Sequence, residues 1–321
     1  MRAAAGLWIA AFASATIAAQ TYPDRPVRFV VASGPGGSTD AVSRIVGDKL
    51  GEFWSQQIVH DNRPGAGGIL AADIVARAAP DGYTILVGTS AGLTVSPSLY
   101  KKMPYDPDKA FAPISVAGTQ DYMLIVNPLL GASVNSVKEL ITMAKTKPGS
   151  IGFSHTGAGT GTHLAGELFK SAAGVDLMSV PYKNITAAVI AVMSNEVPIS
   201  FTSIYTALPQ VRAGKVKAIA VTGEKRAPSI AELPTVAESG VPGYASGNWY
   251  GFLTTAGTPR AVMTKINADV LKALADKNVR TRFSRQGMEP SGSTPDDFAR
   301  FIKSEAVKYA KVVKTAGIRT E

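Results

Sequence analysis

The chain has 321 residues, 45% of them hydrophobic, with a formal net charge of +9 and no cysteine. A single hydrophobic core rarely grows beyond about 250 to 300 residues, so the length predicts two packed units, and the ordinary composition excludes a disordered chain. The absence of cysteine excludes disulfides, thiolate metal sites, a thiol nucleophile and a lipid-modified N-terminal cysteine.

Residues 1–19 have the pattern of a secretory signal peptide. Arg2 precedes an apolar run over 3–17, and the small residues Ala18 and Ala19 follow it. The run is shorter than the roughly 20 residues that a membrane helix needs. We therefore predict that the protein is exported to the periplasm of a Gram-negative cell after cleavage of this segment.

Apolar runs of strand length alternate with segments of helical spacing in the rest of the chain. We expect strands at 27–32, 83–88, 122–127, 151–153, 177–181, 197–202, 216–221 and 250–254. Helix starts are indicated at Ser136, Thr258 and Thr294, each of which precedes a favourable first turn. The alternation predicts mostly parallel sheets flanked by helices, with ligands bound at the carboxyl ends of the strands.

Two glycine-rich loops, at 34–40 and 157–163, follow expected strands and open expected helices. Such loops offer backbone N–H groups, hydroxyl donors and the positive end of a helix dipole, which together suit an anion. Tight strand-to-helix turns would also use glycine, so each loop alone has a purely structural alternative. The candidate ligand-binding residues from these loops are Gly36, Gly37, Ser38, Thr39, Gly159, Thr160, Thr162 and His163.

A second interpretation rests on Ser90, the centre of a G-x-S-x-G run at 88–92 after an expected strand. In serine hydrolases this pattern places the nucleophile, with an acid and then a histidine later in the chain. The residues that satisfy this order are Asp106, Asp108 or Asp121, followed by His155 or His163. A poor helix start after Ser90 and the lack of an oxyanion segment disfavour catalysis, so Ser90 is a binding candidate instead.

Other classes of site find little support. Neither glycine loop matches a nucleotide-binding pattern, and the Lys and Arg residues are scattered rather than gathered on one face, so no nucleic acid is expected. His163 and Glu167 have a metal-chelating spacing but lack a third ligand. We predict neither a metal nor a cofactor.

Several ordered motifs of this chain are similar to those of the substrate-binding proteins of tripartite tricarboxylate transporters, the Bug or TctC-like receptors. The matching runs are YPDRPV at 22–27, GGSTD at 36–40, DNRPGAGG at 61–68, APDGYT at 79–84, LYKKMPYD at 99–106, THLAGE at 162–167, VPYK at 180–183, ALP at 207–209 and LPTVAE at 233–238. The resemblance covers nearly the whole chain after the signal peptide.

The resemblance implies an α/β, two-lobed periplasmic-binding-protein fold of type II, with a ligand cleft between the lobes. Lobe 1 would comprise 22–122 and 252–321, and lobe 2 would comprise 123–251, with crossovers near 120–126 and 249–254. The implied ligand is a small carboxylate, either a di- or tricarboxylate or an aromatic acid. An Asp that is common in the family at the position of Thr202 is absent, which disfavours an amino-acid ligand.

We therefore expect a monomeric solute-binding protein without catalytic residues. The two glycine loops would bind opposite ends of the carboxylate, while Ser90, Thr202 and Ser203 line its sides. Trp249 and Tyr250 either form an apolar wall or pack the hinge. The implied partner is a membrane transporter. The sequence also allows a sensor kinase at the membrane as the partner.

Overall fold

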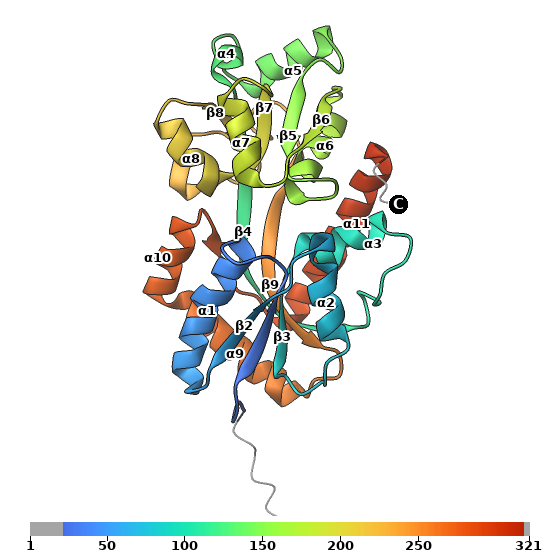
Figure 1. Ribbon diagram of the computed structural model, residues 1–321, viewed down its shortest axis with the longest axis vertical. Helices are drawn as coiled ribbons and strands as arrows, with labels where there is room; N and C mark the ends of the chain where they lie inside the picture. Colours follow the sequence, from blue (N-terminus) through green and yellow to red (C-terminus); the bar gives the residue numbers. More distant parts are fainter. Residues whose placement is uncertain (1–21, 318–321) are drawn as a thin grey trace, which may run out of the picture.

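The structure is a computed structural model that describes residues 22–317, so the predicted signal peptide at 1–19 lies outside the described residues. Two lobes lie one above the other along the longest axis, and strands β4 and β9 run between them (Figure 1). Within the described residues, no helix is both long enough and apolar enough to cross a membrane.

Ten strands and fourteen helices or helical turns are formed between residues 22 and 317. The strands are β1 (Val27–Val31), β2 (Ile58–Asn62), β3 (Thr84–Thr89), β4 (Phe111–Val126), β5 (Gly152–His155), β6 (Met178–Pro181), β7 (Ile199–Ser203), β8 (Lys217–Val221), β9 (Gly247–Thr255) and β10 (Glu289–Pro290). The α-helices are α1 (Ser38–Trp54), α2 (Ile69–Ala76), α3 (Ser96–Leu99), α4 (Pro128–Gly131), α5 (Val137–Thr146), α6 (Gly161–Ala173), α7 (Ile185–Met193), α8 (Ile204–Arg212), α9 (Arg260–Ala275), α10 (Lys277–Arg285) and α11 (Pro295–Ala316). The short turns are η1 (Ala66–Gly68), the π-helical η2 (Ala91–Val95) and η3 (Pro228–Ile230).

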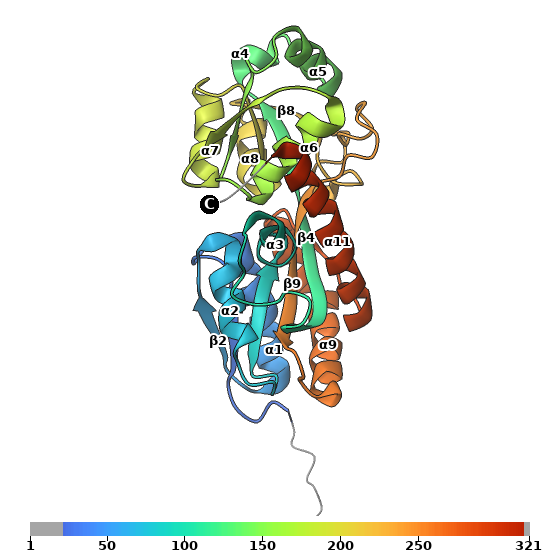
Figure 2. The same ribbon diagram turned by 90° about the vertical axis from the view of Figure 1, so that its right-hand side faces the viewer.

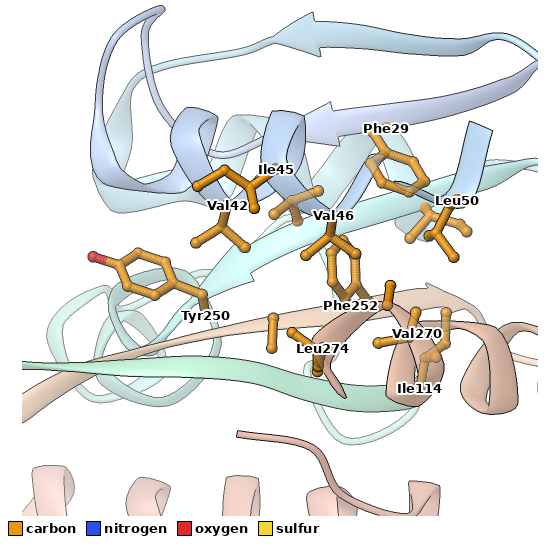
Figure 3. Close-up of a cluster of buried hydrophobic side chains, with 14 of the residues drawn as sticks. Phe29, Val42, Ile45, Val46, Leu50, Ile114, Tyr250, Phe252, Val270 and Leu274 are labelled. Atoms are coloured by element: carbon orange, nitrogen blue, oxygen red, sulfur yellow. The ribbon is translucent and has the colours of Figure 1, made fainter. Parts of the chain in front are cut away.

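The lower lobe in Figure 1 contains one sheet with the strand order β2-β1-β3-β9-β4, and β10 pairs with β4. Strand β1 is buried on both faces, which explains its continuous apolar sequence. Phe29 packs with α1, α9 and α10 on one face, whereas Val30 packs with α2 and Phe298 of α11 on the other. Figure 3 shows the first of these clusters, with Val46 of α1 next to Phe252 and Val42 next to Tyr250.

The upper lobe contains the second sheet, in which β6, β5 and β7 lie side by side and β4 pairs with both β7 and β8. Phe153, Phe169 and Phe201 form the centre of one core, against α5 and α6. Met123 and Ile125 face the other way, toward α7 and α8. Both faces of this sheet are therefore covered by helices.

Strand β4 belongs to both sheets. Its residues up to Asp121 pair with β9 in the lower lobe, and those from Tyr122 onward pair with β7 and β8 in the upper lobe. The pairs β1–β2, β1–β3, β5–β6 and β5–β7 are parallel, but every pair that involves β4 or β9 is antiparallel. The sheets are thus more mixed than strand–helix alternation predicts, because the two crossing strands run in opposite directions.

Two of the three expected helix caps form as predicted. The hydroxyls of Ser136 and Thr294 accept hydrogen bonds from the third residue of α5 and α11 respectively. The expectation for Thr258 was wrong, since its hydroxyl donates to the carbonyl of Thr255 and Pro259 takes the capping position of α9. Strands β2 and β10 and the first part of β4 were not expected from the sequence.

Candidate ligand-binding site

The first glycine loop connects β1 to α1 and is organised by Asp40. The Asp40 carboxylate accepts from the Gly36 amide at 2.9 Å, from Arg44 at 3.0 Å and from Asn62 at 3.0 Å. Burial alone would raise the pKa of Asp40, but these hydrogen bonds outweigh burial, so the pKa is lowered and the group stays ionised. Asp40 therefore holds the loop through internal contacts.

Internal hydrogen bonds decide which donors of this loop are available to a ligand. The Gly36 amide donates to the Asp40 carboxylate, and the Gly37 amide donates to the carbonyl of Gly34 at 3.3 Å. Ser38 and Thr39 are the first residues of α1, so their amides have no carbonyl acceptor within the helix. The available donors thus lie at Ser38 and Thr39 rather than at the preceding glycines.

The second glycine loop connects β5 to α6 and is held by threonines. The Thr160 hydroxyl donates to the carbonyl of Gly157 at 2.7 Å, and the Thr162 hydroxyl accepts from the Thr156 amide at 3.1 Å. Gly159 lies against the lower lobe, since a Cβ there would be 2.3 Å from a methyl group of Leu99. This loop therefore borders the junction of the lobes.

His163 lies inside the upper lobe, 6% exposed, and stacks with Phe153. Its Nδ1 accepts from the Gly159 amide at 3.1 Å, and its Nε2 is 3.7 Å from Glu167. Burial, with smaller contributions from His155 and Lys170, lowers the pKa of His163 to about 4, so the ring is neutral at pH 7. Both ring nitrogens thus face groups of the chain.

Gln120 of β4 is the centre of a hydrogen-bonded network at the lobe junction. Its Oε1 accepts from the Tyr250 hydroxyl at 2.6 Å, and its Nε2 donates to the Ser203 hydroxyl at 3.2 Å and to the carbonyl of Gln286 at 3.1 Å. Tyr250 comes from β9 and Ser203 from the end of β7, so the network joins both lobes. In Figure 3 the Tyr250 ring lies at the edge of the lower core with its hydroxyl pointing away from it.

Ser38 and Ser90 extend this network toward the carboxyl ends of β1 and β3. Ser90 donates to Oδ1 of Asn248 at 2.7 Å. Burial raises the pKa of Tyr250, while hydrogen bonds with Ser38 and Asn248 act in the opposite direction, and the phenol remains protonated. We call Ser38, Ser90, Gln120, Ser203, Asn248 and Tyr250 the junction site; all six side chains are uncharged at neutral pH.

Two further features of the upper lobe lie beside the crossing strand β4. Thr202 precedes Ser203 on β7, is completely buried, and its hydroxyl has no hydrogen-bond partner among the described residues. Gly161, the first residue of α6, lies so close to Tyr122 that a Cβ there would be 1.9 Å from the phenol oxygen. Backbone at the start of α6 thereby approaches the crossing strand closely.

Apolar side chains from both lobes meet beside the junction. Val95 and Leu99 of the lower lobe pack with Leu164 of α6 and with Tyr309 and Val313 of α11. Figure 2 shows α11 rising along the side of the molecule until its end reaches α6. The lobes are therefore in contact in this structure.

Among the described residues, Ser90 has no histidine as a hydrogen-bond partner. The hydrogen-bond partner of Ser90 is Asn248, and the segment after Ser90 forms only the turns η2 and α3. His155 accepts from the Gly157 amide and bonds Ser179, far along the chain from Ser90. In residues 22–317, no group of three or more His, Asp or Glu side chains could hold a metal ion.

The structure therefore gathers some predicted residues and separates others. Ser38, Ser90 and Ser203 meet through the junction site, whereas Thr162 and His163 bond within their own loop. Sequence reasoning missed Gln120 and Asn248 and treated Tyr250 only as an apolar wall or as hinge packing. Gln120 begins the first expected crossover and Asn248 immediately precedes the second, so polar residues at the crossovers were the signal that could have found them.

Known proteins with related sequences and folds match nearly the whole chain. Residues 42–318 match the family described as tripartite tricarboxylate transporter family receptor. The protein BugT of Bordetella pertussis is 33% identical over 98% of this chain and 96% of its own length. The structure of Rpa4515 of R. palustris with adipate is 34% identical, with a TM-score of 0.83 over 93% of this chain and all of that one.

A second solved structure is also similar to this chain in sequence and fold. MatC of Rhodopseudomonas palustris with bound malate is 31% identical, with a TM-score of 0.78 over 91% of this chain and all of that chain. The matches agree with the two-lobed α/β fold and with the resemblance found in the sequence motifs. The chain belongs to the receptor family of the tripartite tricarboxylate transporters, the family that includes the Bug proteins.

Proposed function

We propose that this protein is a periplasmic solute receptor that captures a small carboxylate between its lobes and delivers it to a tripartite tricarboxylate-type membrane transporter. The observation that carries the proposal is the junction site, where neutral hydrogen-bonding groups of both lobes converge. Amides and hydroxyls at two helix starts add donors without adding charge. A ligand that contacts both lobes would favour the closed arrangement.

The chemistry of the site favours a dicarboxylate over an amino acid. Adipate and malate, which are bound by two family members, both carry two carboxylates and no ammonium group. Thr202 offers an uncharged hydroxyl at the position where an acid would be needed to bind an ammonium group. Its missing hydrogen-bond partner also suits a group that binds a ligand or a water molecule.

The family supports the transporter as partner, and we assign the protein no catalytic role. Ser90 donates to an amide oxygen, so it has no general base to activate it in this arrangement. A single chain contributes both walls of the site, so a monomer suffices for binding. The proposed location in the periplasm rests on the family and on the signal-like residues 1–19.

Thermal-shift and calorimetric screening of refolded, ligand-free protein tests the proposal. We expect a C4 to C6 dicarboxylate to raise the melting temperature, and amino acids to leave it unchanged. Ser203→Ala should weaken that binding about tenfold through loss of a hydrogen bond at the lobe junction. Ser171→Ala, on the exposed side of α6, is the matched control and should bind like the parent protein.

The hydrolase alternative is tested with the same preparations. Labelling of Ser90 by an organophosphate probe, with ester cleavage lost in Ser90→Ala, would replace the receptor function by catalysis. A complete lack of response to di- and tricarboxylates, aromatic acids and amino acids would refute the receptor proposal.

A further inference from the structure

A cavity lies on the other face of the crossing strands from the junction site, and we call it the rear cavity. It has a volume of about 410 Å³, and its walls come from both lobes: the loop after β8, the start of β9, α11, and β4 with β10. Figure 2 shows α11 along one side of the crossing strands, with α1 on the other side. The rear cavity is thus formed by segments other than the glycine loops.

Strand alternation separates the rear cavity from the junction site. Gln120 pairs with Asn248, and Asp121 pairs with Gly247, so these pairs lie on opposite faces of the two-stranded ribbon. Trp249 packs with α11 on the second face, whereas Tyr250 packs with α1 and α9 on the first. Asn248 alone borders both sites.

Asp121 is a partly buried acid in the rear cavity wall. No hydrogen bond or ion pair to its carboxylate is formed by the described residues. The carboxylate lies between two glycines: a Cβ on Gly223 would be 2.1 Å from Oδ2, and one on Gly247 would be 3.0 Å from Oδ1. Glycine at both positions leaves space that the carboxylate occupies.

Neighbouring charges do not compensate Asp121. Burial, with smaller contributions from the negative charges of Glu289 and Glu224, raises the pKa of Asp121 to about 6. Arg226 pairs with Glu238, and Lys308 pairs with Glu305, so two cations of the wall are already engaged. Lys225 is exposed and has no ion-pair partner among the described residues.

Trp249 gives an independent indication of a ligand. Its side chain lines the rear cavity and is 2% exposed, and its Nε1–H has no acceptor among the described residues. A buried donor without an acceptor costs stability unless a ligand or a water molecule supplies one. The rings of Trp249 and Phe301, with centroids 5.9 Å apart, give the cavity an apolar part beside its acids.

We propose that the rear cavity binds a small hydroxylated primary amine. The ammonium group would contact Asp121 in the space beside Glu289 and Glu224, and a hydroxyl oxygen would accept from Trp249 Nε1. The carbon skeleton would lie against Trp249 and Phe301. This chemistry is opposite to that of the neutral junction site, so the two sites select different solutes.

The probes are glucosamine and ethanolamine, each with a matched compound. Glucose lacks the ammonium group of glucosamine, and ethylammonium lacks the hydroxyl of ethanolamine. Binding to the whole protein is measured by calorimetry and by the NMR signal of the Trp249 indole N–H, which is assigned by its loss in Trp249→Phe. We expect both amines to give heat and to move this signal, glucose to give neither, and ethylammonium to bind more weakly than ethanolamine.

Two variants localise the binding. Asp121→Asn keeps the shape of the side chain and removes its charge, and it should weaken amine binding about tenfold or more. Gly223→Ala adds a Cβ that displaces the Asp121 carboxylate, so it should also weaken amine binding. Asp108→Asn, an exposed acid outside the cavity wall, should bind as tightly as the parent protein.

The pH dependence of amine binding is a further test of the contact with Asp121. Amine binding should weaken as the pH falls through about 6, because protonated Asp121 no longer attracts the ammonium group. The other charged groups that face the cavity are Glu224, Lys225, Arg226, Glu289, Glu305 and Lys308. The pH effect should vanish in Asp121→Asn.

Three results would overturn the proposal. The first is no heat and no indole shift with either amine at concentrations up to about 10 mM. The second is equal binding by Asp121→Asn and the parent protein, which would mean that the amine binds elsewhere. The third is loss of amine binding in Ser203→Ala with Asp121→Asn unaffected, which would place the amine at the junction site.

Discussion

Gln120 and Asp121 are neighbours on one strand, and their side chains face two very different environments. On the face of Gln120, three hydrogen bonds between uncharged groups join β4, β7, β9 and the end of α10. On the face of Asp121, a carboxylate lies between glycines without any partner among the described residues. One face is preorganised by the protein itself, whereas the other is incomplete without an added group.

The difference shows how a crossing strand can serve two purposes. The Gln120–Ser203 hydrogen bond favours one arrangement of the lobes, because it must break when the lobes separate. Unsatisfied groups beside them raise the energy of the same arrangement. The predictions below perturb one face at a time.

The largest expected effect comes from Gly161→Ala, on the Gln120 side. A Cβ there would lie 1.9 Å from the Tyr122 phenol oxygen, so α6 must move away from the crossing strand. We expect a loss of about 3 kcal/mol in the free energy of unfolding, measured by urea denaturation.

Two further variants check the cause of that loss. Tyr122→Phe removes the clashing oxygen, so combined with Gly161→Ala it should recover part of the stability. Gly34→Ala places a Cβ where no atom lies within 4 Å and should be close to neutral. Equal losses for Gly161→Ala with and without the Tyr122 oxygen would contradict the steric explanation.

Gln120→Ala should cost about 2 to 3 kcal/mol in the free energy of unfolding. The substitution leaves the Tyr250 hydroxyl, the Ser203 hydroxyl and the Gln286 carbonyl without their partner. Gln210→Ala, on the surface of α8, is the control and should cost less than about 0.5 kcal/mol. A small effect at Gln120 would mean that water replaces its hydrogen bonds.

Asp121→Asn should increase the free energy of unfolding, and the size of this increase should depend on pH. Burial raises the pKa of Asp121 from its ordinary 3.8 to about 6, so the folded protein binds this proton more tightly than the unfolded chain does. The stability that the proton provides is complete below pH 3.8 and is lost as the pH rises through about 6. We therefore expect Asp121→Asn to be more stable than the parent protein by about 2 kcal/mol at pH 8.

The same variant should lose its advantage in acid. Below about pH 4 both side chains are neutral, so the melting temperatures of Asp121→Asn and the parent protein should nearly coincide. Denaturation series at several pH values measure this convergence. A stability difference that does not change with pH would show that Asp121 is not held in an unfavourable ionised state.

The smallest expected effect is that of Thr202→Val. Replacing a buried hydroxyl that has no protein partner by a methyl group should stabilise the fold by about 1 kcal/mol. If the hydroxyl binds the carboxylate ligand, the same change should weaken that ligand about tenfold, as calorimetry would show. Unchanged affinity would remove Thr202 from the site.

Strands and helices with continuous apolar patterns were predictable from the sequence. Strand β1 is buried on both faces, and α1 directs Val42, Val46 and Leu50 into one core, so their patterns are unambiguous. Strand β2 was missed because Ile58–Asn62 is half-buried and ends in polar residues. The first half of β4 was missed because Pro113 and Gly118 interrupt it where its pairing shifts.

The site was predictable only where residues stand at the ends of strands. Ser38, Ser90 and Ser203 follow or end expected strands, and strand ends face ligands in this class of fold. Gln120 and Asn248 lie within strands, and their proximity depends on the pairing of β4 with β9. Pairing between segments so far apart leaves no local pattern in the sequence.

The place of β9 between β3 and β4 also imposes an order on folding. During synthesis the whole segment 127–246 leaves the ribosome after β3 and β4 but before β9. Until β9 arrives, the facing edges of β3 and β4 are open and their apolar side chains are uncovered. The lower lobe should therefore form slowly and after the upper one.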